Sequence, residues 1–302
     1  MPGRYYMITR RCTQQQFLLH PDVETTNAFK YCLIVAAQKY FIDVLGPCAL
    51  SNHHHTVIYD RLGHHPLFTE YFHRLLARCM NARLGRRENF WSSEQVNVVL
   101  LADVDAVVRK LAYAFLNPVE ARLVEHPNDW PGVNGYRNVM NGKPLQATRP
   151  KWFFSEHDSA LPEHVSMRLH IPAELEPERF RERLRARIKR RLAKLRDHRI
   201  RHKLSVLGAE RIRAETHNQH PKRDGRYTKT NRRRIRPTIA CRDAERRKAL
   251  ILERRSFVRE YRKARVQWVY NKPTVFPEGT FWLYRYAHAP VPPLRFAPVL
   301  IH

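Results

Sequence analysis

Several features that would assign a chain to a familiar class are missing from this sequence of 302 residues. No apolar run approaches the ~18 residues that a membrane-spanning helix needs, so we expect no membrane partner. The N-terminal stretch "MPGRYYMITRRC" lacks the apolar region of a signal peptide, and the expected compartment is a reducing cytoplasm. The five cysteines are scattered without CxxC spacing, which argues against a disulfide framework and a cysteine zinc site.

Acidic residues are also scarce. The chain has 55 Lys and Arg against 28 Asp and Glu, a formal net charge of +27, while 43% hydrophobic residues are enough to build a core. Residues 1–150 hold 17 basic and 12 acidic side chains, a balance of +5, and residues 151–302 hold 38 and 16, a balance of +22. A basic excess of this size favours a polyanionic partner, most often nucleic acid.

The first half of the chain alternates between strand and helix patterns. β-Rich composition, helical apolar spacing and Gly or Pro punctuation predict these elements in order: strand 5–12, helix 26–40 after a capping threonine, extended segment 41–51, strand 53–60, helix 66–84, strand 96–102 and helix 104–117. We expect Gly85 to end the second helix, Asp103 to cap the third and Pro118 to stop it. The alternation predicts an α+β fold with helices covering a small sheet.

Beyond about residue 150 the sequence becomes basic and mostly helical. Apolar residues share one stripe of an arginine-rich segment, and we expect that stripe to pack against another element: Phe180, Leu184, Ile188, Leu192 and Leu195. Residues 215–237 are polar and basic without an apolar period and are typical of a linker. A second basic helix is predicted near 242–268, and the aromatic run within 276–291 has the composition of a strand.

Three consecutive histidines open the strand "HHHTVIYD" at 53–60. Alternate side chains of a strand share a face, so His53 and His55 point one way and His54 the other. This spacing could present two imidazoles to one cation. An equally consistent interpretation is a half-exposed strand whose histidines form local hydrogen bonds.

A second pattern lies in "RKLAYAFLNPVEARLV" at 109–124, where Tyr113 and Asn117 are four residues apart and share one face of the predicted helix. Taken alone, such a pair is more typical of packing and capping than of catalysis. The histidine pattern and the Tyr113–Asn117 pattern together are more specific than either pattern alone.

Together they resemble the single-tyrosine HUH transposases, in particular the REP-associated tyrosine transposase branch. The resembling segments follow one another along residues 4–140: "YYMITRRC", "SNHHHTVIYD", "FWSSEQVNVVLL", "LAYAFLNPVEARLV" and "DWPGVNGY". The resemblance implies a ferredoxin-like antiparallel sheet covered by helices. It further implies a transposase domain at 1–147, which leaves 148–302 as a basic, mostly helical extension of unassigned role.

The resemblance also implies roles for the patterned residues. His53 and His55 would hold a divalent cation, Mg²⁺ or Mn²⁺, on the scissile phosphate of single-stranded DNA, and Asn117 could supply an oxygen ligand. Tyr113 would attack the phosphorus and form a 5′-phosphotyrosine, which keeps the cut reversible. His54 departs from the family, because the middle residue of the motif is usually bulky and apolar. A polar ring there should cost stability unless it is partnered or exposed.

Several further residues are candidates for DNA contact. They are cationic or aromatic side chains of the first half: Arg10, Arg11, Arg83, Arg86, Arg87 and Trp91. For Trp91 a core position beside the third strand is an equal alternative. The expected partner is single-stranded or hairpin DNA, the protein is either a monomer or a homodimer, and the compartment that the resemblance implies is the bacterial cytoplasm.

Two other functions are compatible with the same motifs. One is a descendant that binds structured nucleic acid without cutting it, and intact Tyr113, His53 and His55 argue against this. The other is an HUH endonuclease of replication or plasmid mobilisation. The histidine motif precedes the tyrosine helix, which is the transposase order, whereas many relaxases place the tyrosine near the N-terminus.

Overall fold

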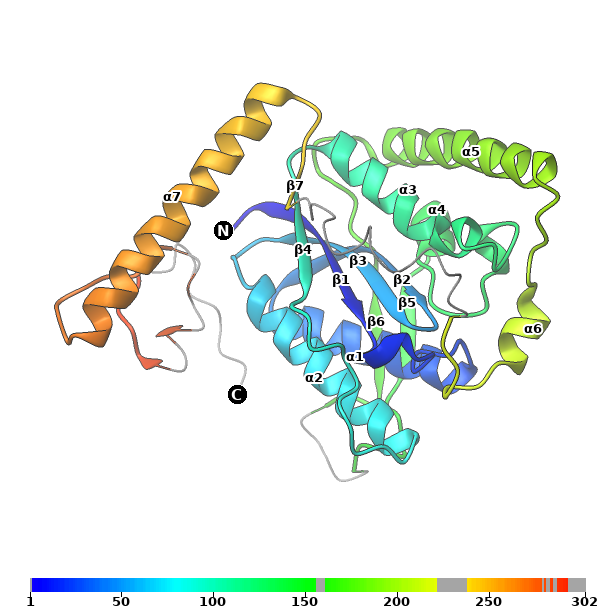
Figure 1. Ribbon diagram of the computed structural model, residues 1–302, viewed down its shortest axis with the longest axis horizontal. Helices are drawn as coiled ribbons and strands as arrows, with labels where there is room; N and C mark the ends of the chain where they lie inside the picture. Colours follow the sequence, from blue (N-terminus) through cyan, green and yellow to red (C-terminus); the bar gives the residue numbers. More distant parts are fainter. Residues whose placement is uncertain are drawn as a thin grey trace.

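A mixed α+β architecture is seen in the computed structural model, which describes residues 2–155, 161–221, 238–278, 280, 283–284 and 287–292 (Figure 1). The strands are β1 (Arg4–Arg11), β2 (Ile42–Leu50), β3 (His53–Asp60), β4 (Asn97–Leu101), β5 (Leu145–Thr148), β6 (His164–Met167) and β7 (Ile239–Ala240). The helices are α1 (Val23–Lys39), α2 (His65–Arg83), α3 (Val104–Glu120), α4 (Tyr136–Asn141), α5 (Pro177–Arg201), α6 (Ala209–Ala214) and α7 (Ala244–Val269), with 3-10 turns η1 (Thr13–Gln15) and η2 (Pro127–Asp129).

The main sheet has the order β2-β3-β1-β4-β7. Its first four strands pair antiparallel, and the β1-α1-β2-β3-α2-β4 path through them is the ferredoxin-like split βαβ arrangement, as predicted. β7 adds a fifth strand, parallel to β4. Residues 145–148 and 164–167 form a separate two-stranded sheet. The boundary near residue 147 stays a prediction.

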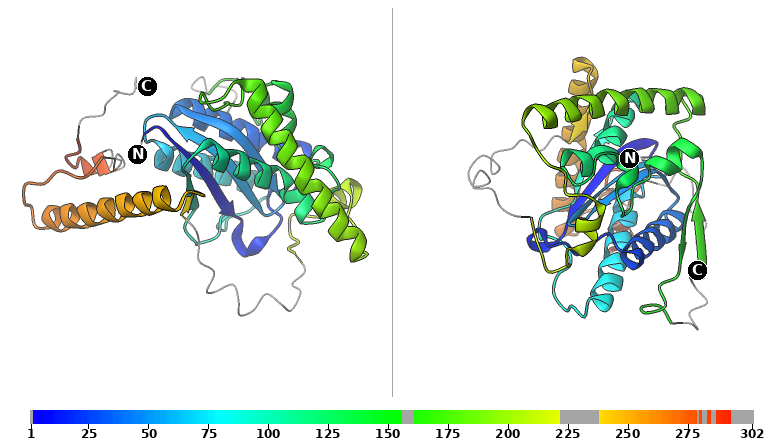
Figure 2. Two further views of the ribbon diagram at one scale, coloured as in Figure 1. Left: turned by 90° about the horizontal axis from the view of Figure 1, so that it is seen from above. Right: turned by 90° about the vertical axis from the view of Figure 1, so that its right-hand side faces the viewer.

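Two cores lie on opposite faces of the main sheet (Figures 1 and 2). α1 and α2 cover one face, where Tyr6 and Ile8 of β1 meet Phe29 and Phe72. α3 covers the other face, and α5 packs on α3. The buried members of the predicted stripe on α5 are Phe180, Leu184 and Ile188, which confirms that this stripe packs against another element.

The structure corrects two predictions about helix ends and confirms a third. α1 begins at Val23 and is capped by the Asp22 carboxylate, which accepts from the Thr25 N–H, rather than by a threonine. α3 is capped by Asp103 as predicted but continues past Pro118 to Glu120, because a proline in the last turn removes only one hydrogen-bond donor before the helix ends. Gly85 follows the end of α2 with φ of +61°, as expected of a terminating glycine.

The extended segment 41–51 forms β2, an edge strand, where Pro47 lacks an N–H at little cost. The second basic helix is confirmed as α7, which projects away from the sheet (Figure 2). Part of the predicted linker, 222–237, lies outside the described residues, and the described residues within 276–291 contain no strand. Among the described residues no helix is long and apolar enough to span a membrane.

Candidate functional site

The histidine strand β3 divides its side chains between the two faces of the sheet as the alternation predicted. His55 lies opposite Thr9 of β1 and Cys48 of β2, and His53 lies opposite Arg11. The imidazole rings of His53 and His55 are 5.0 Å apart between centroids and lie on the face covered by α3. His53 is half-buried and His55 is buried. Two imidazoles therefore face one region beneath α3.

α3 brings the second pattern to the same place. The Tyr113 ring lies 5.2 Å from the His55 ring between centroids, and Asn117 Nδ2 is 3.2 Å from His55 Nε2. Asn117 also lies close enough to His53 and Tyr113 to shift their pKa values, raising that of His53 and lowering that of Tyr113. Tyr113 remains 39% exposed, which leaves its hydroxyl group open to a substrate. The structure thus brings together His53, His55, Tyr113 and Asn117 from two distant segments.

Glycine at position 46 allows α3 to approach the sheet this closely. β2 has a bulge between Val44 and Gly46, and a Cβ atom at Gly46 would lie 2.5 Å from Phe115 Cζ and 2.7 Å from Leu111 Cδ2. No side chain larger than hydrogen fits there without moving α3.

The segment "DWPGVNGY" fastens β2 to α3 along the free edge of the sheet. Trp130 Nε1 donates to the Ala49 carbonyl at 2.9 Å, and the Gly135 N–H donates to the Pro47 carbonyl at 2.8 Å. Asn134 Nδ2 reaches the Phe115 carbonyl at 3.0 Å, inside α3. This segment therefore holds the helix of Tyr113 against the strand that flanks the histidines.

Hydrogen bonds fix the tautomers of the two histidines. His53 Nδ1 is 2.6 Å from Asn52 Oδ1, which can only accept, so Nδ1 carries the proton. His55 Nε2 accepts from Asn117 Nδ2, so His55 Nδ1 donates to Thr9 Oγ1 at 2.8 Å. Both Nε2 atoms therefore keep a lone pair, as a metal ligand requires. Asn52 and Thr9 are partners that the sequence analysis missed, because only the fold places them beside the rings.

The electrostatics of the site keep both imidazoles neutral. Burial lowers the pKa of His53 to about 4, opposed by the hydrogen bond to Asn117. Burial and the neighbouring His53 lower the pKa of His55 in the same direction. A histidine that is neutral at physiological pH needs to release no proton to bind a cation.

The donor set fits a divalent cation that takes nitrogen and oxygen. Two imidazole Nε2 atoms are present, and turning the Asn117 amide by half a rotation exchanges Nδ2 for Oδ1, an oxygen donor. Imidazole with amide oxygen is compatible with Mg²⁺ and suits Mn²⁺ better. Among the described residues no group of three or more His, Cys, Asp or Glu is arranged to hold a metal. The pair of histidines would consequently depend on Asn117 and on substrate oxygens to complete the coordination.

Tyr113 does not ionise readily in this setting. Burial and the charge of Glu120 raise the pKa of its phenol, and the hydrogen bond from Asn117 lowers it only in part. One turn earlier, Lys110 Nζ lies 5.5 Å from the centroid of the Tyr113 ring. Burial and the nearby Arg109 lower the pKa of Lys110. Lys110 is therefore a cation beside the Tyr113 ring.

His54 lies on the opposite face of the sheet, fully buried under α2. Its Nε2 is 2.8 Å from Nε2 of His73, and its Nδ1 is 3.0 Å from Thr56 Oγ1. Burial lowers the pKa of both His54 and His73, the latter to about 3, so the pair is neutral and one ring donates to the other. His54 is accordingly a partnered core residue that faces away from the other two histidines. Nothing in the sequence pairs it with a residue on α2.

The predicted DNA contacts on β1 separate by face. Arg11 lies on the face of His53 and pairs with Glu94 at 2.5 Å. Arg10 lies on the opposite face and donates to the Ser92 carbonyl at 3.4 Å, and burial lowers its pKa. The structure therefore places Arg11 beside the candidate site and Arg10 away from it.

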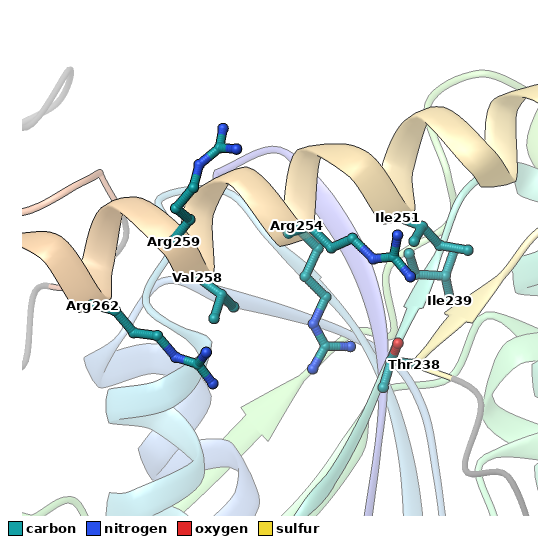
Figure 3. A pocket seen from close by; sticks show the side chains of 8 residues that line it. Thr238, Ile239, Ile251, Arg254, Val258, Arg259 and Arg262 are labelled. Carbon is teal, nitrogen blue, oxygen red and sulfur yellow. The ribbon is translucent and has the colours of Figure 1, made fainter.

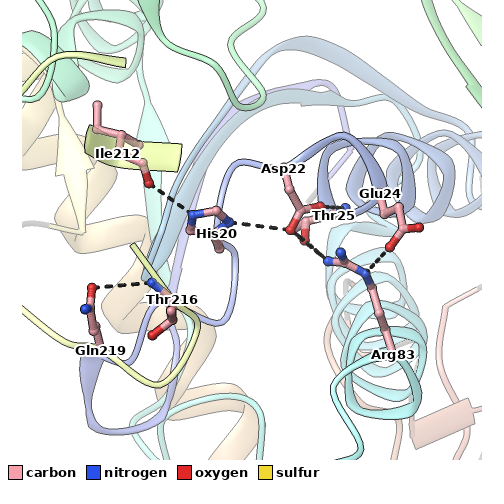
Figure 4. A network of polar contacts seen from close by, with 8 residues as sticks. All are labelled: His20, Asp22, Glu24, Thr25, Arg83, Ile212, Thr216 and Gln219. Atoms are coloured by element: carbon pink, nitrogen blue, oxygen red, sulfur yellow. Dashed lines mark hydrogen bonds and ion pairs between the residues drawn. The ribbon is translucent and has the colours of Figure 1, made fainter. Parts of the chain in front are cut away.

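The remaining predicted contacts are not brought to the site. Arg83 ties α2 to α1 by ion pairs with Asp22 and Glu24 at 2.9 and 2.6 Å (Figure 4). Arg86 is half-buried and Arg87 is exposed beyond the end of α2. Trp91 is buried, and its Nε1 donates to the His73 carbonyl. Trp91 thus anchors the core, and the expectation that it stacks on a base is wrong because its ring is covered.

Comparison with known proteins finds limited similarity to solved structures. No family model and no curated protein matches the chain. A solved structure of a REP-associated tyrosine transposase bound to a REP hairpin is similar with a TM-score of 0.40 and 15% sequence identity. The match covers 55% of this chain and 94% of that chain. A similarity of this size does not establish a common family.

Proposed function

We propose that the protein is a single-tyrosine DNA transposase of the HUH type, which cleaves and rejoins single-stranded DNA near hairpins. The observation that carries the proposal is the meeting of Tyr113 and Asn117 on α3 with the two neutral histidines of β3. This is a nucleophile, a pair of imidazole ligands and an amide within one small region, with the phenol open to solvent.

The three side chains that would hold a divalent cation are His53, His55 and Asn117, through two Nε2 atoms and the amide oxygen. When bound, Mg²⁺ or Mn²⁺ withdraws charge from the phosphoryl oxygens of the scissile phosphate. Thr9 and Asn52 keep the rings in the tautomer and orientation that this role needs. Thr9 and Asn52 therefore act through the rings of His55 and His53 and are not themselves ligands.

Tyr113 acts as the nucleophile. Its phenolic oxygen forms a bond to phosphorus while the bond from phosphorus to the 3′ oxygen breaks, which leaves a 5′-phosphotyrosine and a free 3′-hydroxyl group. The phenol proton passes to a base or to water, and the departing 3′ oxygen takes up a proton. Attack of a 3′-hydroxyl on the phosphotyrosine reverses the sequence and rejoins a strand.

Lys110 assists Tyr113 by charge. An ammonium group near the ring stabilises negative charge that develops on the phenolic oxygen, in a half-buried position where the interaction is screened less than in water. Asn117 contributes a hydrogen bond to the same oxygen. These two residues offset the burial that otherwise disfavours the phenolate.

The basic second half supplies the attraction for a polyanion. α5 carries twelve Lys and Arg against three acidic residues and packs along α3, the helix of Tyr113. DNA binding through such a surface weakens steeply as salt rises, because counterions are released on binding. The bacterial cytoplasm is the compartment in which this activity would operate.

The test is a covalent adduct. The protein is incubated with hairpin-bearing single-stranded DNA and Mg²⁺ or Mn²⁺, and denaturing gels report the adduct. We expect adduct with the wild type, none with Tyr113→Phe, and loss with His53→Ala or His55→Ala. Tyr270→Phe is the matched control, because Tyr270 is 72% exposed just after the end of α7 and its replacement should leave the adduct unchanged.

Adduct formation by Tyr113→Phe would show that the nucleophile is another group. Unchanged metal-dependent cleavage in the two histidine variants would contradict the ligand assignment. Hairpin binding without an adduct on any substrate would favour a protein that binds structured nucleic acid without cutting it.

A further inference from the structure

A second cationic surface lies at the far edge of the sheet, on α7. A hollow of about 460 Å³ is lined by four arginines of this helix together with Thr238, Ile239, Ile251 and Val258 (Figure 3). The arginines are Arg254, Arg255, Arg259 and Arg262, called here the α7 arginine surface. Arg262 points to the same side of the helix as Val258, and Arg259 points to the other side (Figure 3).

These arginines are not neutralised by the described part of the chain. Some other arginines pair with carboxylates, as Arg83 does with Asp22 and Glu24. Arg254, Arg255 and Arg262 have no ion pair with any described residue, and Arg259 donates only to the hydroxyl of Ser256. Unpaired like charges on one helix repel one another, so a surface of this kind is stabilised when an anion binds.

α7 is held firmly enough to present such a surface. Leu250 packs with Ile239 and Cys241 against Leu100 of β4. Glu253 pairs with Arg4 of β1 at 3.1 Å, on the side of the helix turned to the sheet. Nearer its end, Ala264 packs with Phe276 in a small cluster. The helix that carries the four arginines is therefore anchored, and the arginines border the hollow beside β7.

We propose that the α7 arginine surface binds the phosphate backbone of DNA that extends from the candidate site. The spacing supports this partner. An α-helix rises about 1.5 Å per residue, so Arg254 and Arg262 are about 12 Å apart along the axis. A strand advances roughly 3.4 Å per nucleotide, and the surface spans three to four phosphates. Guanidinium groups bind phosphate oxygens in pairs of hydrogen bonds.

The distance to Tyr113 sets the length of DNA required. Three strand steps from β3 to β7 cover about 14 Å, and Leu100, the partner of Ile239, lies three residues beyond Asn97, which adds about 10 Å. Ile239, which lines the hollow, is therefore roughly 17 Å from His55 along the sheet, a span of at least about five nucleotides. A minimal substrate confined to the site would not reach it.

The identification of DNA as the partner rests on the proposed function. The dependence of binding on DNA length tests the α7 arginine surface separately from the cleavage activity. Two hairpin-bearing DNAs are compared, a minimal one and one extended by about ten nucleotides on each side. We expect the wild type to bind the extended DNA about tenfold more tightly, and Arg255→Gln/Arg262→Gln to lose that gain. The slope of log affinity against log salt should fall by about 1.4–1.8 for two lost contacts.

Arg246→Gln/Lys263→Gln is the matched control, since it removes two charges from α7 at positions that do not line the hollow. It should keep the gain from length. Equal loss of the gain from length in both double variants would overturn the inference. So would a gain that persists in Arg255→Gln/Arg262→Gln when this variant no longer binds anionic vesicles, because the surface would then bind lipid and not DNA. Equal thermal melting of all variants confirms that they fold.

Formation of the Tyr113 adduct distinguishes failure of the proposed function from failure of the proposed surface. On saturating minimal DNA, Arg255→Gln/Arg262→Gln should form the Tyr113 adduct as the wild type does. If wild type forms no adduct but the gain from length still depends on Arg255 and Arg262, the cleavage proposal fails and the DNA surface stands. If the adduct forms and length has no effect, the surface fails instead.

Discussion

At the scale of the residue, the three consecutive histidines have different environments although they differ in position by only one residue each. His53 and His55 are held by Asn52 and Thr9 so that each Nε2 keeps its lone pair, and Nε2 of His55 accepts from Asn117. His54 is paired with His73 in the opposite core. Strand alternation separates them, and the hydrogen-bond partners decide which can serve as ligands.

Thr9 offers the sharpest test of that distinction. Thr9→Val keeps the shape of the side chain but removes the hydroxyl group that accepts from His55 Nδ1. Loss of such a partner typically reduces metal affinity or activity 10–100-fold, so we expect the Mn²⁺ concentration for half-maximal adduct formation to rise by about that factor. Metal titration of the adduct measures it. Thr9→Ser should restore the wild-type requirement, and an unchanged requirement in Thr9→Val would show that His55 needs no such partner.

At the scale of the element, the position of α3 decides whether the site exists. The helix carries Tyr113 and Asn117 on one face through its own period, but it reaches the histidines only because Gly46 lets Phe115 and Leu111 lie against β2. The segment around Asn134 then ties β2 and α3 together.

Gly46→Ala should therefore weaken both the fold and the site. The added Cβ meets Phe115 Cζ at 2.5 Å, and overpacking of this kind costs about 1–3 kcal/mol of unfolding free energy. We also expect slower adduct formation, because α3 must shift away from β3. Denaturant unfolding and adduct kinetics measure the two effects. Gly46→Ala/Phe115→Leu frees space and should recover part of each, whereas no change in Gly46→Ala would mean that the helix does not rest on this glycine.

At the scale of the whole molecule, a histidine joins the N-terminal fold to α6. His20 Nδ1 is 3.5 Å from Asp22 Oδ2, and its Nε2 is 3.0 Å from the Ile212 carbonyl (Figure 4). Both partners only accept, so both ring nitrogens donate and the ring is an imidazolium. The hydrogen bond to Asp22 raises the pKa of His20, while burial opposes it. Arg83 shares Asp22, and Glu215 lies nearby with a pKa that burial raises.

The sign of the pH effect follows from the raised pKa of His20. Its stabilising contribution is fully present below the unfolded value of about 6.5 and is lost as pH rises through the higher folded value. We expect amide exchange in residues 209–214, corrected for the intrinsic rate, to accelerate as pH rises above about 6.5. His20→Gln should abolish that pH dependence. Equal protection of α6 across this range in the wild type would show that the imidazolium does not hold it.

Much of the candidate site could be predicted because it depends on local periodicity. The two-residue repeat of a strand put His53 and His55 on one face, and the helical period put Tyr113 and Asn117 on another. Asp103 as a cap and the apolar stripe of α5 follow from the same short-range rules. The ferredoxin-like order of the first four strands came from the motif resemblance, and strand pairing confirmed it.

Local sequence patterns were enough to predict β1–β4, α1–α3, α5 and α7 and the faces of their side chains, since these arise from contacts within a few residues. Packing between distant segments decided that Trp91 is buried and that Arg83 forms an ion pair with α1. It also decided that His54 contacts His73 and that β7 brings α7 to the edge of the sheet. Each of these joins residues far apart in the chain. The physical reason is that burial and pairing depend on which distant surfaces pack together, and local periodicity carries no information about that choice.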